Sequence, residues 1–157
     1  MWFFMISCYI LSAVTALMLA AAFFQNIWGF SVFAAGELTF IILTSIVYLF
    51  TETLVIFFFV GTGVSVKEYT QKHKLGPNYQ KRSLGVKFRV YPPLLLNLFL
   101  MIVVFVLVGA VDTRRLPAIV YQALFTIAFI HFIKVKTIQH QCFRDNTRII
   151  LDMAGVK

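Results

Sequence analysis

Long apolar runs separated by short polar stretches dominate the chain. A helix needs roughly 20 apolar residues, at about 1.5 Å of rise each, to cross the hydrocarbon core of a bilayer. Four runs reach that length, at 2–24, 38–64, 90–111 and 117–134. Prolines at Pro92, Pro93 and Pro117 suit the first turns of the third and fourth helices, where an N–H is not needed. The pattern predicts an all-α integral membrane four-helix bundle.

The last part of the chain, 135–157, mixes polar and apolar residues at helical spacing. An apolar face is expected to hold Ile138, Cys142, Ile149 and Met153. Gln139, Arg144 and Arg148 are expected to point away from that face, and Arg148 and Asp152 have the i, i+4 spacing of an ion pair. We therefore expect an amphipathic helical extension of the fourth span, lying on the membrane or against a partner.

The composition supports a membrane protein and argues against a soluble domain. Of the 157 residues, 61% are hydrophobic and only 13% are charged. A soluble domain of this size cannot hide that much apolar surface, because much of its own surface must face water. The N-terminus lacks the basic stretch of a signal peptide, so its apolar run is expected to be the first span.

The positive charges indicate the topology. Of the 14 Lys and Arg, seven lie between the second and third spans and five lie in the region from Lys134 onward, whereas only Arg114 and Arg115 fall between the third and fourth. By the positive-inside rule both termini are expected in the cytoplasm, with domain 1–134 in the plasma or inner membrane and 135–157 as a cytoplasmic tail.

The same charges indicate which partners to expect. Basic side chains beside a membrane attract anionic lipid headgroups. Headgroup contact is expected from Lys72, Lys74, Lys81, Arg82, Lys87 and Arg89. The lipid bilayer thus accounts for the net charge of +8, and we expect no binding to nucleic acid.

Glu52 is the one charged residue in the apolar run from Leu38 to Val66. A carboxylate at that depth costs about 2.5–3.5 kcal/mol on insertion scales, so it marks a functional site by default. Tyr48 lies one turn away on the same helical face and is expected to reach the Glu52 carboxyl group. Gly61 and Gly63 suit an end or bend of the helix, or the close approach of a ligand or another helix.

Two further polar residues lie within the spans at comparable depth. Asn97 falls about two turns into the third span and His131 near the cytoplasmic end of the fourth. We expect a cluster of Glu52, Tyr48, His131 and Asn97 that binds an ion or relays protons. The structural alternative is that Glu52 is a neutral carboxyl group that donates a hydrogen bond between helices. His131 would then be a packed, hydrogen-bonded residue without a role in binding or proton transfer.

No motif in the chain supports catalysis or a metal centre. His140 and Cys142 do not have a zinc-ligand spacing, and only His131 among the histidines lies within a span, so haem would need a second ligand from another chain. The cofactor is left unknown. Two functions stay open: a homo-oligomeric ion or proton-coupled transporter or channel that uses Glu52, or a structural or accessory subunit of a larger membrane complex.

Overall fold

A computed structural model of the chain describes residues 2–30, 32 and 36–155. These residues form four helices: α1 (Trp2–Trp28), α2 (Glu37–Lys72), α3 (Asn78–Asp112) and α4 (Ala118–Met153). Each expected span falls within one of them, except that Pro117 directly precedes α4. All four helices are long and apolar enough to cross a membrane, which confirms the all-α, four-helix prediction.

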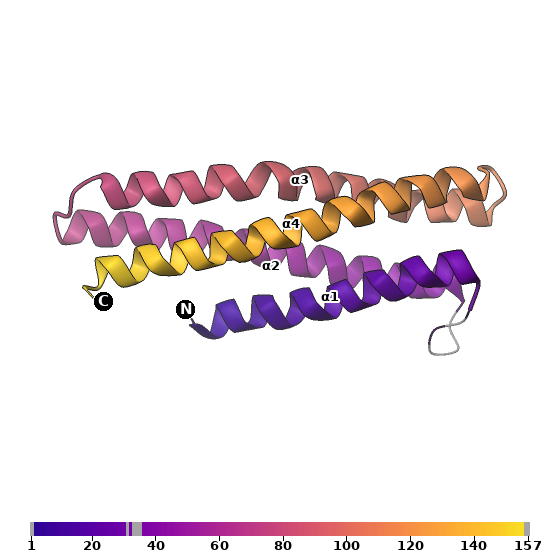
Figure 1. Cartoon of the computed structure of the whole chain (residues 1–157), viewed down its shortest axis with the longest axis horizontal. Coiled ribbons are helices and arrows are strands. Elements are labelled where there is room, and N and C mark those ends of the chain that lie inside the picture. The colour runs from indigo at the N-terminus through magenta and orange to yellow at the C-terminus, as the bar shows by residue number, and fades with distance from the viewer. Residues whose placement is uncertain (1, 31, 33–35, 156–157) are drawn as a thin grey trace.

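The helices lie side by side along one long axis, with both termini at the same end of the bundle (Figure 1). The connection between α2 and α3 is at that end too, and the α1–α2 and α3–α4 connections are at the other (Figure 1). α1 packs mainly on α2 and much less on α4, while α4 packs mainly on α3. The seam between α1 and α4 is therefore the least closely packed of the bundle.

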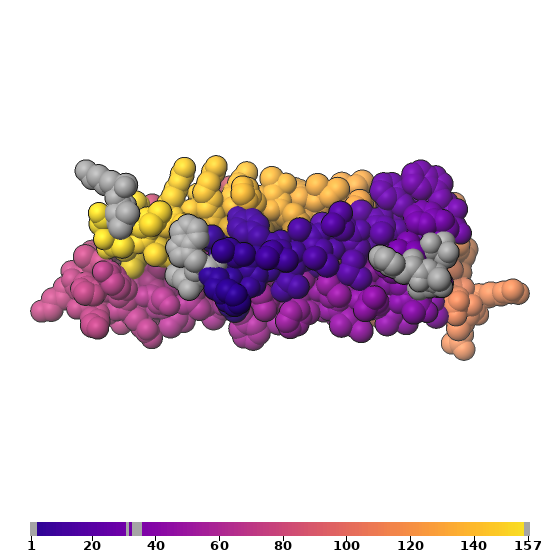
Figure 2. Space-filling model, turned by 90° about the horizontal axis from the view of Figure 1, so that it is seen from below, coloured from indigo at the N-terminus to yellow at the C-terminus, as the bar shows by residue number. Residues whose placement is uncertain are grey.

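Three of the helices are longer than a membrane requires. α2, α3 and α4 have 36, 35 and 36 residues, or about 53 Å each, against a hydrocarbon core of about 30 Å. Figure 2 shows that they extend past the beginning of α1 at the end where the chain termini lie. The bundle therefore has four helices over most of its length and three beyond α1.

Two sequence-based expectations about helix boundaries are wrong. α2 does not end at Gly61 or Gly63 but continues as far as Lys72. The close-approach alternative agrees with the structure at Gly63, where the Lys87 side chain of α3 occupies the space that a side chain would need. α3 begins at Asn78, and Pro92 and Pro93 lie inside it. Since proline has no N–H to donate, α3 lacks two backbone hydrogen bonds at this point.

Apolar side chains fill the bundle in two clusters, one toward each end. Val55, Phe59 and Phe143 belong to the cluster nearer the termini, and Met101 and Phe125 to the other. Large apolar side chains also cover the outside, as expected where lipid replaces water: Phe57, Phe99 and Ile130 are each more than 60% exposed.

The tail from 135 onward continues α4 without a break and packs on α2 and α3 of the same chain. Phe143 contacts Phe58 and Phe59 of α2 with ring centroids 4.9 and 5.0 Å apart. Gln139, which we expected to face away, is only 2% exposed and faces the bundle interior. The expected Arg148–Asp152 pair is also wrong, because the Asp152 carboxylate is paired with Arg82 of α3 at 2.9 Å.

Candidate functional site

The Glu52 carboxylate is buried and paired with a lysine from the far end of the sequence. Lys136 Nζ of α4 lies 2.6 Å from Glu52 Oε1. The second carboxylate oxygen, Oε2, accepts a hydrogen bond from Gln139 Nε2 at 2.7 Å. The Glu52 side chain is 1% exposed and the Lys136 side chain 17%. The two charges therefore compensate each other inside the bundle.

The Lys136 ammonium has a full set of polar neighbours. It donates to Glu52, to Gln139 Oε1 at 2.9 Å and to Ser12 Oγ of α1 at 3.2 Å. It also lies 5.2 Å from the centroid of the Phe132 ring, within range of a cation–π contact. These bonds join α1, α2 and α4 in one polar layer, and they satisfy the charges whose desolvation is the main cost of burying an ion pair.

The other three predicted site residues form a second, separate chain of hydrogen bonds. Asn97 Nδ2 donates to the Tyr48 hydroxyl at 2.8 Å, and Asn97 Oδ1 lies 3.1 Å from His131 Nδ1. The chain joins α2, α3 and α4. The expected contact between Tyr48 and Glu52 is replaced by these bonds.

Phe132 packs against both the Lys136 layer and the Tyr48–Asn97–His131 hydrogen bonds. Its ring centroid is 6.1 Å from that of Tyr48 on one side, and the Lys136 ammonium lies over its face on the other. Phe132 is 2% exposed. Tyr48, Asn97 and His131 thus come together as predicted, whereas Glu52 lies one helical turn away with partners of its own.

A groove in the α1–α4 seam leads to Lys136. Its volume is about 230 Å³. Ser12, Ala13 and Ala16 form the α1 wall, while Lys136, Gln139 and His140 lie on the α4 side. Tyr9 and His140 close one part of the groove through a 3.0 Å bond between the Tyr9 hydroxyl and His140 Nδ1. The small side chains of Ser12, Ala13 and Ala16 leave space beside the ammonium.

The depth of the ion pair follows from helix geometry. Lys136 lies about 27 Å along α4 from its first residue, Ala118, and Glu52 about 22 Å along α2 from Glu37. If α2 and α4 enter a hydrocarbon core of about 30 Å at Glu37 and Ala118, both residues lie inside it, nearer the side of the chain termini.

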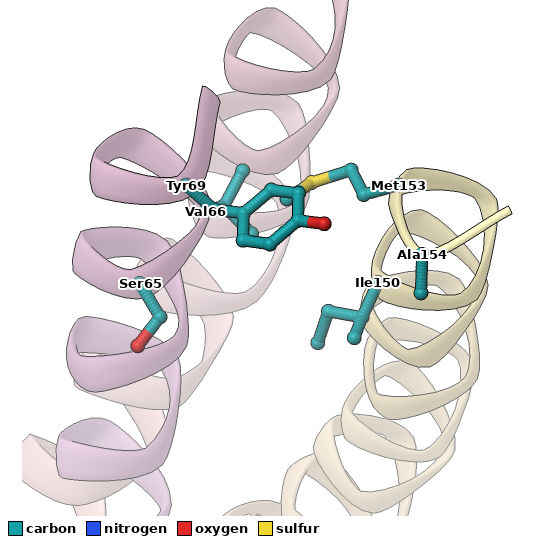
Figure 3. A pocket seen from close by; sticks show the side chains of 6 residues that line it. All are labelled: Ser65, Val66, Tyr69, Ile150, Met153 and Ala154. Carbon is teal, nitrogen blue, oxygen red and sulfur yellow. The ribbon is translucent and has the colours of Figure 1, made fainter. Parts of the chain in front are cut away.

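A smaller cavity lies between α2 and α4 beyond the beginning of α1. It has a volume of about 140 Å³ and mostly apolar walls that include Val66, Ile150 and Met153. The Tyr69 side chain extends from α2 toward Met153 on α4 (Figure 3). The Ser65 side chain lies apart from this contact. The walls offer little polar chemistry.

The basic residues expected at lipid headgroups lie on the part of α2 and α3 nearest the chain termini. Lys72, Lys81, Arg82 and Arg89 are exposed, as is Lys74 in the α2–α3 connection, and Lys87 is partly buried. Two of them have acidic partners on α4: Arg82 pairs with Asp152, and Arg89 with Asp145 at 3.2 Å. Arg89 also donates to Gln141.

Sequence reasoning identified Glu52 but missed Lys136 and Gln139. The expected fourth span ends at residue 134, so Lys136 falls among the charges expected in the cytoplasmic tail. The buried positions of α4 include Phe132, Val135, Gln139 and Cys142, at alternating steps of three and four residues. That period continues past 134 and was the signal that this segment still packs in the bundle.

Among the described residues, no group of three or more His, Cys, Asp or Glu side chains is placed to hold a metal ion. Comparison with known proteins gives no family assignment: no family model, curated protein or solved structure matches the chain.

Proposed function

We propose that this protein is a membrane carrier in which proton binding at Glu52 controls the charge that Lys136 presents to a solute. The topology in the proposal is the one indicated by the positive-inside rule, with both termini in the cytoplasm. The solute is a small anion. The observation that carries the proposal is that Lys136 contacts Glu52 on one side and lines the α1–α4 groove on the other.

The mechanism follows from the charge balance of the pair. With Glu52 ionised, Lys136 is compensated and the groove offers no net charge. When Glu52 takes up a proton, the Lys136 ammonium loses its counterion at a depth where an uncompensated charge is costly. An anion entering the groove replaces the lost charge. Proton and anion therefore favour each other's binding, as symport requires.

The packing favours a carrier over an open channel within one chain. The two apolar clusters occupy the interior on either side of the polar layers. A continuous aqueous path along the bundle axis would have to displace them. Access from the seam requires movement of α1, which packs on α4 much less than on α2. In a homo-oligomer, the solute path would run between copies of the chain instead.

Proton flux in proteoliposomes tests the proposal. An inward proton gradient with succinate outside should acidify vesicles that contain the protein, and Glu52→Gln and Lys136→Gln should abolish the protein-dependent flux. Thr137→Ala is the matched control, because Thr137 is exposed and bonds only to its own helix through Ile133 O. Wild-type flux in Glu52→Gln vesicles would exclude a carrier that depends on this carboxylate.

The second candidate is a structural or accessory subunit of a membrane complex. It is favoured by the complete hydrogen bonding of Glu52 and Lys136, which is what a fixed link between helices requires. In this role the loosely packed α1–α4 seam would receive a helix of another subunit. Purification in a mild detergent separates the two: unrelated subunits at fixed stoichiometry support the accessory role, and a single species or homo-oligomer supports the carrier.

A further inference from the structure

A second charged cavity lies between α3 and α4, well away from the Glu52–Lys136 pair. Its volume is about 370 Å³. Val86 and Ile149 form an apolar floor and Gly85 leaves space beside it, while Arg82, Arg89 and Arg148 bring three guanidinium groups to its walls. Asp145 is the one acidic residue among the lining side chains.

Two of these arginines are held in place and the third is free. Asp152 fixes Arg82 at 2.9 Å and Asp145 fixes Arg89 at 3.2 Å. Arg148 has no hydrogen-bond or ion-pair partner among the residues described. The three arginines and their two acidic partners therefore leave one positive charge without a partner. Planar guanidinium groups that can donate two parallel hydrogen bonds are well suited to phosphate oxygens.

The position of the cavity along the bundle points to a lipid. Arg89 lies about 35 Å along α3 from Asp112, and Arg148 about 45 Å along α4 from Ala118. A bilayer has a hydrocarbon core of about 30 Å and a total thickness of about 40–45 Å with its headgroups. If the α3–α4 connection lies at one interface, the cavity lies at the headgroup level of the other.

An apolar surface continues from the cavity toward the membrane centre. Leu96, which lies two turns from Arg89 on the same face of α3, is 52% exposed. A soluble phosphate would use only the arginines. A lipid uses the arginines for its headgroup and the α3 surface for an acyl chain, and basic pockets between membrane helices on the cytoplasmic side commonly hold acidic headgroups in this way.

We infer that the Arg82–Arg89–Arg148 cavity binds the phosphate of an anionic phospholipid from the cytoplasmic leaflet. Neutral zwitterionic lipid binds there more weakly, because its own cation opposes the unpaired Arg148. The site is independent of the carrier proposal, since it shares no residue with the Glu52–Lys136 pair or its groove.

Native mass spectrometry of the full-length protein in a neutral detergent tests this inference. Dioleoyl phosphatidic acid and dioleoyl phosphatidylcholine, which have the same acyl chains, are titrated separately. We expect Arg148→Gln to weaken phosphatidic acid binding about tenfold, the effect of losing one charge-assisted hydrogen bond. Arg144→Gln is the control: Arg144 is exposed one turn away on α4 but does not line the cavity. It should change binding by less than about twofold.

Two further measurements keep the inference falsifiable. Arg89→Lys preserves the charge but removes the paired donors, and should also weaken binding. Inorganic phosphate at a tenfold excess over phosphatidic acid should not displace the lipid; displacement would assign the cavity to a soluble phosphate and overturn the lipid inference. Equal loss of binding in Arg144→Gln and Arg148→Gln, or no loss in either, would overturn the site itself.

Discussion

The ammonium of Lys136 on α4 lies 2.6 Å from the carboxylate of Glu52 on α2, and the carboxylate is 1% exposed. An ion pair at this depth has a large desolvation cost, so it is weak evidence for net stability. Its consequence is a dependence of each residue on the other. A change of charge at either residue leaves the other uncompensated inside the bundle.

This dependence predicts a strong non-additivity in stability. Glu52→Gln and Lys136→Met alone should each lower the free energy of unfolding by about 3 kcal/mol or more, because each leaves one buried charge without a counterion. The double variant should lose less than the sum of the two. Denaturant unfolding in a fixed detergent measures all four proteins. Simple additivity would contradict a direct pair.

The second polar layer gives a prediction about Asn97, which bonds to Tyr48 and to His131. Asn97→Leu should destabilise the protein by about 1 kcal/mol, because it removes two interhelical hydrogen bonds and each contributes about 0.6 kcal/mol on average in a membrane protein. Ser45→Ala is the control, since Ser45 bonds only to the backbone of its own helix. Equal effects of the two substitutions in thermal unfolding would show that the Asn97 bonds contribute nothing.

A substitution in the groove tests whether solute reaches Lys136 through the seam, without changing the ion pair. Ala13 lines the α1 wall, and Ala13→Phe should reduce proton flux at least tenfold by filling the space in front of Lys136. Val14→Phe adds a comparable bulk at the next residue, which is 41% exposed and does not line the groove. Flux should therefore be near wild type in Val14→Phe. A normal rate in Ala13→Phe would show that solute does not approach through this seam.

The topology predicts opposite labelling of the two ends of the bundle. A cysteine at Arg115, in the α3–α4 connection, should react with a membrane-impermeant thiol reagent on intact cells. A cysteine at Lys74, near the α2–α3 connection, should react only after permeabilisation. The native Cys8 and Cys142 are buried and free, so their background should be low. The reverse labelling pattern would place the termini outside the cytoplasm.

How far the sequence could predict this structure differs between the fold and the site. Apolar length identified all four helices, because burial in lipid depends on little else. The parts of α2, α3 and α4 that continue past the apolar runs are harder to predict, since polar outward faces there conceal the buried positions. Pro92 and Pro93 led to a wrong helix boundary for a related reason. Packing on α4 keeps α3 continuous where proline alone suggests that a helix begins.

Only part of the site could be predicted. The cost of placing a polar residue in an apolar run can be read from the sequence. The partner that such a residue meets depends on how the helices pack. Glu52 and the Tyr48–Asn97–His131 set could be identified as polar residues within apolar runs. The tail region holds several cations. The helical period indicates that this segment packs in the bundle, but it does not show that Lys136 meets a carboxylate of α2. Only the placement of α4 against α1 and α2 decides that.

In the proposed carrier, proton uptake at Glu52 is linked to anion binding beside Lys136. The most direct measurement is the pH change of a weakly buffered, detergent-solubilised protein when succinate is added. Wild type should take up about one proton per bound anion, because linkage between the two sites is reciprocal. Glu52→Gln should take up none, since its amide cannot be protonated at these pH values. Succinate binding without proton uptake in the wild type, or equal uptake in Glu52→Gln, would contradict the account.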